Sequence, residues 1–170
     1  MGGSLHFKLA SLCALALLCA PSAPAIAANS GSASVANASA RLLAAHNLER
    51  SRVGVPALQW DPALAAAAAS YGPQLARIGR LRHSPRATPP GQRENLWMGS
   101  RGAFSPEQMV GSWIAEKREF RPGVFPNVSR TGDWSDVSHY TQLVWRGTTR
   151  VGCAIHRSPQ WDFLICRYSP

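Results

Sequence analysis

The chain has 170 residues, of which 18 are Lys or Arg and 9 are Asp or Glu, so its formal net charge is +9. Nearly all of the basic residues are Arg, and they are dispersed along the chain. A strongly basic protein adsorbs to anionic surfaces such as lipid headgroups or wall polymers. Because no nucleic-acid motif accompanies the Arg residues, we expect no nucleic-acid partner.

The first 27 residues have the pattern of a secretory signal peptide. A basic start at residues 6–8 precedes an apolar run at 9–20, and small residues follow at Ala25 and Ala27. The apolar run is too short to span a bilayer, so we expect no integral membrane protein. We predict cleavage after Ala27, with Ala28 as the alternative, and export to the extracellular space, or to the periplasm of a Gram-negative bacterium.

Removal of the signal peptide would leave one domain. Residues 28–38 are small and polar and predict a flexible leader, and residues 39–170 suffice for one ordinary domain. Only Lys8 would be lost among the charged residues, so the net charge would fall from +9 to +8. In an exported protein the remaining Cys153 and Cys166 favour one disulfide over two separate buried thiols.

Two helices are predicted in the first half of the domain. The first spans about 39–52 and ends at the Gly-Val-Pro of 54–56. The second begins with Asp61 as N-cap and Pro62 at the first helical position. Pro73 lies inside the second pattern and predicts a kink or an end there.

The middle of the chain predicts a loop followed by a third helix. Residues 79–102 contain several Pro, Gly and polar residues and are interpreted as a long loop. Ser105 and Gln108 form a capping box around Pro106, and the helix that follows is expected to end at Pro122.

The segment 139–145 (HYTQLVW) joins polar side chains to an apolar run that should be buried. It follows an irregular stretch at 121–138, and its seven residues fit either a short helix or a strand. This combination predicts the wall of a polar pocket anchored in the core. His46 lies on the apolar stripe of the first helix and is expected to pack or to bond a backbone group. His83 and His139 adjoin polar, irregular chain instead.

The C-terminal residues predict a β-hairpin formed by 151–157 and 161–168. A two-residue turn at 159–160 would place Cys153 opposite Cys166 in a non-hydrogen-bonded pair. The Cα atoms of such a pair lie about 4.5 Å apart, within disulfide range. Pro-Gln is not a favoured hairpin turn, and a bulge would change this register. Helices before and after short strands, without βαβ repetition, indicate a layered α+β domain.

Several short motifs occur in order along residues 39–170, and together they are specific. They are His46-Asn47 with Arg50, the PALQW of 56–60, His83-Ser84, the ENL of 94–96, the WIAE of 113–116, the HYTQLVW of 139–145, the GCA of 152–154 and the CRYSP of 166–170. In these motifs the chain resembles the CAP superfamily, which includes cysteine-rich secretory proteins, wasp-venom antigens and plant pathogenesis-related proteins.

The resemblance implies a three-layer α-β-α sandwich with a central cleft. It brings His83, Glu94, Glu116 and His139 together in that cleft. His83 and His139 would bind a divalent metal, often zinc, although two protein imidazoles make a thin site compared with the three protein ligands of catalytic zinc. Glu94 and Glu116 are the candidate catalytic carboxylates, since either would complete the metal's ligands or deprotonate a bound water.

Two residues depart from the family pattern: Arg93 and Ser138 stand where Gly is usual. Arg93 is expected to pair with the adjacent Glu94 and to lower the pKa of its carboxyl group, which would weaken a general-base role.

The preferred function is a secreted binding module for a lipid, a sterol or a wall component. It rests on export, charge, the resemblance and the absence of a nucleophile–base pair. A metal-dependent hydrolase or peptidase that uses the two His and two Glu residues is the second hypothesis, without a zinc-peptidase motif to support it. In the third, the same four residues only stabilise the cleft.

Overall fold

The computed structural model describes residues 1–2, 30–85 and 92–170. The predicted signal peptide lies outside these residues, apart from its first two. One sheet forms the centre of the fold, in the order β1-β3-β4-β2. β1 pairs with β3 in parallel, and the other two pairings are antiparallel. The strands are β1 (Gln59–Trp60), β2 (Arg93–Ser100), β3 (Arg150–Arg157) and β4 (Trp161–Ser169).

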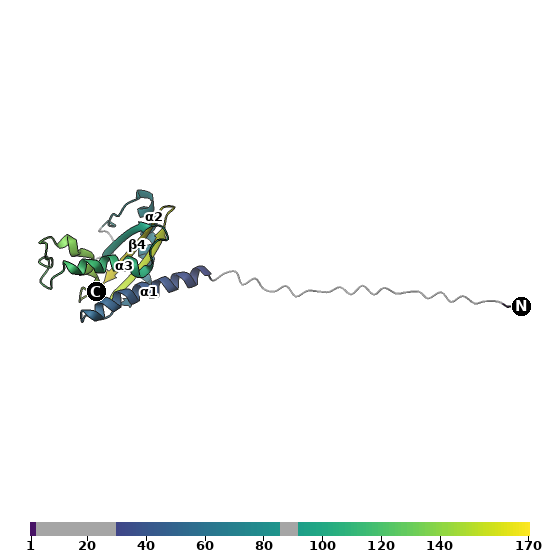
Figure 1. Ribbon diagram of the computed structural model, residues 1–170, viewed down its shortest axis with the longest axis horizontal. Coiled ribbons are helices and arrows are strands. Elements are labelled where there is room, and N and C mark those ends of the chain that lie inside the picture. Colours follow the sequence, from purple (N-terminus) through teal and green to yellow (C-terminus); the bar gives the residue numbers. More distant parts are fainter. Residues whose placement is uncertain (3–29, 86–91) are drawn as a thin grey trace.

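Helices cover both faces of this sheet (Figure 1). The α-helices are α1 (Ser30–Arg52), α2 (Pro62–Ile78), α3 (Pro106–Ile114) and α4 (Ser138–Leu143), and the 3₁₀ helices are η1 (Ala115–Arg118) and η2 (Trp134–Val137). Among the described residues, no helix combines the length and the apolar character needed to cross a bilayer.

Two buried clusters, one on each face of the sheet, give the fold its layers. On one face, Tyr71 and Leu75 of α2 pack with Phe163 and Ile165 of β4. On the other face, α1, α3 and α4 contribute to a cluster that includes Leu164. Successive β4 side chains thus alternate between the clusters, as the two-residue period of a strand requires. The predicted three-layer α-β-α sandwich is confirmed.

The ends of α2 follow the predicted capping chemistry. Asp61 Oδ1 accepts hydrogen bonds from the backbone N–H groups of Ala63 (2.8 Å) and Leu64 (3.1 Å). The helix continues through Pro73, because burial of its apolar stripe on the sheet outweighs the missing hydrogen bond. It ends at Gly79, whose φ of 63° closes the last turn.

The start of α3 is also as predicted, but its end is not. Ser105 and Gln108 form the capping box, with Pro106 at the first helical position. The α-helix stops at Ile114, and η1 carries the chain only to Arg118, so the prediction that the helix reaches Pro122 is wrong.

Helix α1 begins at Ser30, earlier than the predicted start at Ser39. Residues 30–38, interpreted as a flexible leader, therefore have helical backbone. Their Ala residues carry little conformational cost in a helix, which explains why small residues are compatible with either state.

The prediction of a continuous loop at 79–102 is wrong in its second half, where β2 lies. Asn95, Leu96 and Trp97 are all buried, because helices cover both faces of the sheet. A strand that is buried on both sides lacks the alternation that reveals a half-exposed strand. The Asn and Gly residues of β2 weakened the strand signal further.

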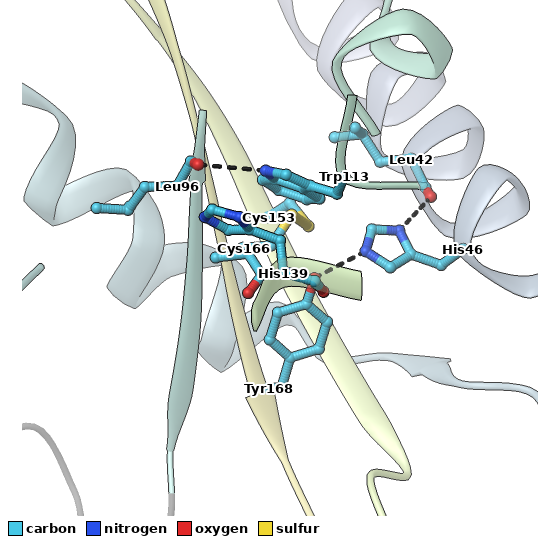
Figure 2. Close-up of a disulfide and its surroundings, with 9 residues drawn as sticks. Leu42, His46, Leu96, Trp113, His139, Cys153, Cys166 and Tyr168 are labelled. Atoms are coloured by element: carbon cyan, nitrogen blue, oxygen red, sulfur yellow. Dashed lines mark hydrogen bonds between the residues drawn. A yellow bond between two sulfur atoms is a disulfide. The ribbon is translucent and has the colours of Figure 1, made fainter. Parts of the chain in front are cut away.

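The predicted hairpin register is confirmed. Cys153 lies opposite Cys166, with 4.1 Å between their Cα atoms, and the two form a disulfide. The N–H of Ser158 donates to Trp161 O at 2.8 Å beside the turn, so no bulge shifts the strands. The disulfide lies in the cluster beneath Trp113, on the α1 and α3 face (Figure 2).

Candidate functional site

His83 and Glu94 form the first half of the site. His83 lies in the loop after α2, and Glu94 is the second residue of β2. His83 Nδ1 donates to Glu94 Oε1 at 2.9 Å. This hydrogen bond raises the pKa of His83 above its ordinary value. It also fixes the orientation of an imidazole that is otherwise largely exposed.

Glu94 has further partners that use up its oxygens. The N–H of Ser84 donates to Oε1 at 3.1 Å and its hydroxyl to Oε2 at 3.0 Å. Arg167 of β4 forms an ion pair with Oε2 at 3.2 Å. Burial opposes the charge on Glu94, but the hydrogen bonds from His83 and Ser84 outweigh it and hold the pKa below the ordinary value. The carboxylate is therefore ionised and well satisfied.

The expected pairing of Arg93 with Glu94 is wrong. No ion pair joins Arg93 to Glu94, and the cation that contacts Glu94 is Arg167. Neighbouring strand residues point to opposite faces of a sheet, so Arg93 faces away from its neighbour. Arg167 is the register partner of Glu94 across the β2–β4 ladder and shares its face. Without β2 in the prediction, this partner was not identifiable from the sequence.

His139 and Glu116 form the second half of the site. His139 is the second residue of α4, and Glu116 lies in η1 rather than in the body of α3. His139 Nδ1 donates to Glu116 Oε1 at 2.6 Å, and the N–H of Tyr140 donates to Glu116 Oε2 at 3.0 Å. Glu116 thus holds both the imidazole and the start of the helix that carries it.

Trp113 and Asn95 fix His139 from two other directions. The Trp113 ring lies parallel to the imidazole, with 6.0 Å between centroids and 10° between planes (Figure 2). Asn95 Nδ2 donates to the backbone oxygen of His139 at 3.0 Å. Neither residue was predicted to position His139, although both lie in motifs noted in the sequence.

A cavity of about 950 Å³ lies between the two halves. His83, Glu94 and His139 line it, whereas Glu116 does not and supports His139 from behind. The structure therefore brings three of the four predicted residues to one cavity. The fourth acts through His139.

The arrangement fits a metal held by two imidazoles. Each ring uses Nδ1 for a carboxylate, and neither Nε2 atom makes a hydrogen bond to a residue that the structure describes. A metal-binding His characteristically donates its other ring N–H to a carboxylate in this way. Within residues 30–85 and 92–170, however, no group of three or more His, Cys, Asp or Glu side chains is placed to hold a metal. A bound ion would thus need water or a ligand to complete its coordination.

A buried chain of hydrogen bonds lies behind the site and connects it to α1. Asn95 Nδ2 donates to the Tyr168 hydroxyl (3.3 Å), which donates to His46 Nε2 (2.9 Å). His46 Nδ1 donates to Leu42 O (2.8 Å), which confirms the predicted backbone bond (Figure 2). Burial lowers the pKa of His46 to about 4, so this imidazole is neutral and structural.

Three aromatic side chains on the cavity lining were not predicted as site residues. Phe125, Trp134 and Trp145 all line it, and each is about half exposed (47%, 46% and 48%). The expectation that the HYTQLVW segment is buried is therefore wrong for Trp145, although Tyr140 and Leu143 are buried. The helix ends at Leu143, so Trp145 leaves the core.

Known proteins are similar to this chain in sequence and in fold. Residues 43–168 match the family model described as CAP, the cysteine-rich secretory protein family. Pathogenesis-related protein 1 of Arabidopsis thaliana is 40% identical over 129 residues, which cover 75% of this chain and 73% of that protein. The PR-1 type pathogenesis-related protein of Sambucus nigra is 38% identical over 128 residues, covering 74% and 72%.

Among solved structures, the crystal structure of NaASP2 with Zn²⁺ superposes with a TM-score of 0.65 at 23% identity, covering 77% of this chain and 78% of that one. At this identity the likeness shows the fold. The motifs, the layered sheet with its disulfide hairpin and the family match agree, and the chain belongs to the CAP, or cysteine-rich secretory protein, family.

Proposed function

We propose that this protein is an exported binding module whose cavity takes a ligand beside a divalent cation held by His83 and His139. The observation that supports it is that His83 and His139 each use Nδ1 for a hydrogen bond to a carboxylate. Both imidazoles are oriented by carboxylates, and both Nε2 atoms are left without a protein partner among the described residues. Zinc is the cation that the donor set favours, because neutral imidazole is one of its preferred ligands.

Glu94 and Glu116 would orient the metal ligands rather than perform proton transfer. Glu94 accepts from His83 and twice from Ser84 and is paired with Arg167, and the lowered pKa makes it a weak base. Glu116 is engaged with His139 and the backbone of α4. When bound, zinc would offer a Lewis-acidic contact to a ligand in the cavity.

The hydrolase hypothesis ranks second because both oxygens of Glu94 and both oxygens of Glu116 already accept hydrogen bonds. Ser84 donates its hydroxyl to Glu94, but the lowered pKa of that carboxylate makes it a weak base for activating a nucleophile. Hydrolytic activity that depends on both His83 and His139 would favour it. A purely structural role for the four residues predicts instead that His→Ala variants lose stability and keep ligand binding.

The ligand class proposed for the cavity is a lipid, a sterol or a wall component. Its volume of about 950 Å³ lies at the upper end of the range for small-molecule sites. NaASP2, which shares the fold, was crystallised with Zn²⁺, which is compatible with a metal in this fold.

Export follows from the proposed signal peptide. Sequencing the N-terminus of protein recovered from a culture medium or periplasm tests it, with Ala28 expected as the first residue. An N-terminus at Met1 would contradict the proposal.

Calorimetric titration of the mature domain with zinc tests the metal site. We expect one site in the wild type and a loss of affinity of at least about tenfold in His139→Ala. His156→Ala is the control, since His156 lies on β3 outside the cavity lining. Equal affinities in all three proteins would exclude the site at His83 and His139.

A further inference from the structure

The cavity lining combines hydroxyl and amide side chains with half-exposed aromatic rings. The polar members away from the two His–Glu pairs include Ser135, Ser138, Thr141, Gln142 and Thr148. Thr141 is more than nine-tenths buried, and its hydroxyl makes no hydrogen bond to any described residue. The Thr141 hydroxyl is closed off from the cavity, and Gln142 donates to Thr148. Ser135, Ser138 and Gln142 nevertheless remain accessible to a ligand that brings hydroxyl groups of its own.

The aromatic rings supply a second kind of contact. Phe125 and Trp134 meet edge to face, with centroids 5.3 Å apart at 63°, so each restricts the other's orientation. Trp145 presents a third ring on the lining. A sugar ring matches both features, because its C–H face stacks on an aromatic ring while its rim of hydroxyl groups forms hydrogen bonds.

Arg93 adds a positive charge to the same lining. Strand alternation places it on the same face of the sheet as Asn95, whose side chain donates a hydrogen bond to the backbone oxygen of His139. All nine Asp and Glu residues of the chain lie in described segments, and none is within ion-pair distance of the Arg93 guanidinium. Its side chain is exposed, so it is available to an anionic group on a ligand.

We infer that the cavity binds an acidic oligosaccharide, with sugar rings stacked on Trp134 and Trp145 and a carboxylate, or a similar acid group, paired with Arg93. This assignment rests on the proposed function and specifies the wall component it would recognise. It does not require the metal, because the aromatic rings and Arg93 lie outside the two His–Glu pairs.

Titration of the full mature chain with a short galacturonate oligomer tests the inference. Tryptophan fluorescence and calorimetry would be recorded at an ionic strength of about 0.15 M, which screens loose charge–charge attraction. A chelator excludes metal bridging. A neutral galactose oligomer of equal length is the matched ligand.

We expect saturable binding of the acidic oligomer and weaker binding of the neutral one. R93Q should lower the affinity for the acidic oligomer about five- to tenfold and leave the affinity for the neutral oligomer unchanged. R101Q removes the same charge just beyond the other end of β2 and should have no effect. W134A should lower the affinity for both oligomers about tenfold. W161A, at the hairpin end of the sheet, should change neither affinity.

Equal losses in R93Q and R101Q would mean non-specific attraction and would overturn the inference, as would the absence of saturable binding. Binding of sterol-containing vesicles that W134A abolishes, without binding of the acidic oligomer, would also overturn it. That last result would leave the proposed binding module intact. Zinc titration of the same preparation reports on the proposed metal site separately.

Discussion

At the scale of single residues, the surroundings of each histidine decide its chemistry. His46 is fully buried between Leu42 O and the Tyr168 hydroxyl, with no carboxylate to stabilise a proton. His83 and His139 each face a carboxylate and a cavity. The sequence indicated the burial of His46, because this residue lies on an apolar helical stripe. It did not reveal that Glu116 stands behind His139 rather than beside the cavity.

His46 makes the fold sensitive to mild acid. The folded-state pKa of about 4 lies below the ordinary 6.5, so the unfolded chain binds more protons between these pH values. The contribution of His46 to the free energy of unfolding therefore falls as the pH falls from about 6.5 to 4, by on the order of 2–3 kcal/mol, while the raised pKa of His83 acts in the opposite direction. Urea unfolding at about pH 7 and pH 5 would measure it, above the range where carboxylates titrate. A His46→Gln variant is expected to show a shallower slope, and an unchanged slope would contradict this account.

Glu116 allows the support of His139 to be separated from metal binding itself. Glu116→Gln keeps the size of the side chain but removes the charge that stabilises the Nδ1–H of His139. Zinc affinity, measured by calorimetry, should fall about 10- to 100-fold. Glu119→Gln is the matched control, since Glu119 pairs with Arg118 on the surface and does not line the cavity. If Glu116→Gln bound zinc as tightly as the wild type, Glu116 would have no role in supporting the metal site.

At the scale of elements, the C-terminal hairpin was predictable and β2 was not. The hairpin strands are adjacent in sequence, so one turn position determines every pair, including Cys153 with Cys166. β2 pairs with β4 across more than 60 residues of chain, and no local signal specifies that register. The partner of Glu94 depends on this long-range pairing, which is why Arg167 was missed and Arg93 was expected instead.

The disulfide should stabilise the hairpin without determining its register. It closes a short segment, with a sequence separation of 13. Replacing both cysteines by Ala is expected to lower the free energy of unfolding by about 2–3 kcal/mol, since a loop of this size loses limited entropy on closure. Denaturant unfolding of the oxidised wild type and the double variant would measure the difference. If the double variant did not fold at all, the disulfide would be required for folding and would not only add stability.

Gly152 marks the closest approach of α2 to the sheet. A Cβ at this position would lie 2.2 Å from Ala65 N and 2.4 Å from Asp61 O, both backbone atoms at the start of α2. Gly152→Ala must push the helix away and should cost at least about 1–3 kcal/mol of unfolding free energy. Gly111→Ala is the control, because open space surrounds that position in α3, and it should stabilise by about 0.5–1 kcal/mol. Thermal unfolding of both variants would measure the two effects. A Gly152→Ala variant as stable as the wild type would refute the close contact.

At the scale of the whole molecule, the layered fold brings distant segments to one end of the sheet. The first residues of β2, the last residues of β4, and α4 meet at the cavity. The family resemblance predicted this sandwich and its cleft, because its motifs specify the order of elements. The shape of the cavity and its aromatic lining depend on the irregular segments around Phe125 and Trp134, whose backbone no periodic pattern predicts.

The excess of Arg over carboxylates should make the whole molecule adhere to anionic surfaces in a salt-dependent way. Seven of the nine carboxylates lie within ion-pair distance of a basic side chain, yet 18 Lys and Arg residues leave a net charge of +9. Exposed charges are screened beyond about 8 Å at 0.15 M salt and about 3 Å at 1 M. Sedimentation with phosphatidylglycerol vesicles should therefore show binding at low ionic strength that is lost near 1 M salt, with R93Q and R101Q reduced to the same small extent. Because this adsorption depends on total charge and the cavity depends on Arg93 in particular, a larger loss in R93Q than in R101Q on vesicles would mean that the cavity itself contacts the lipid surface.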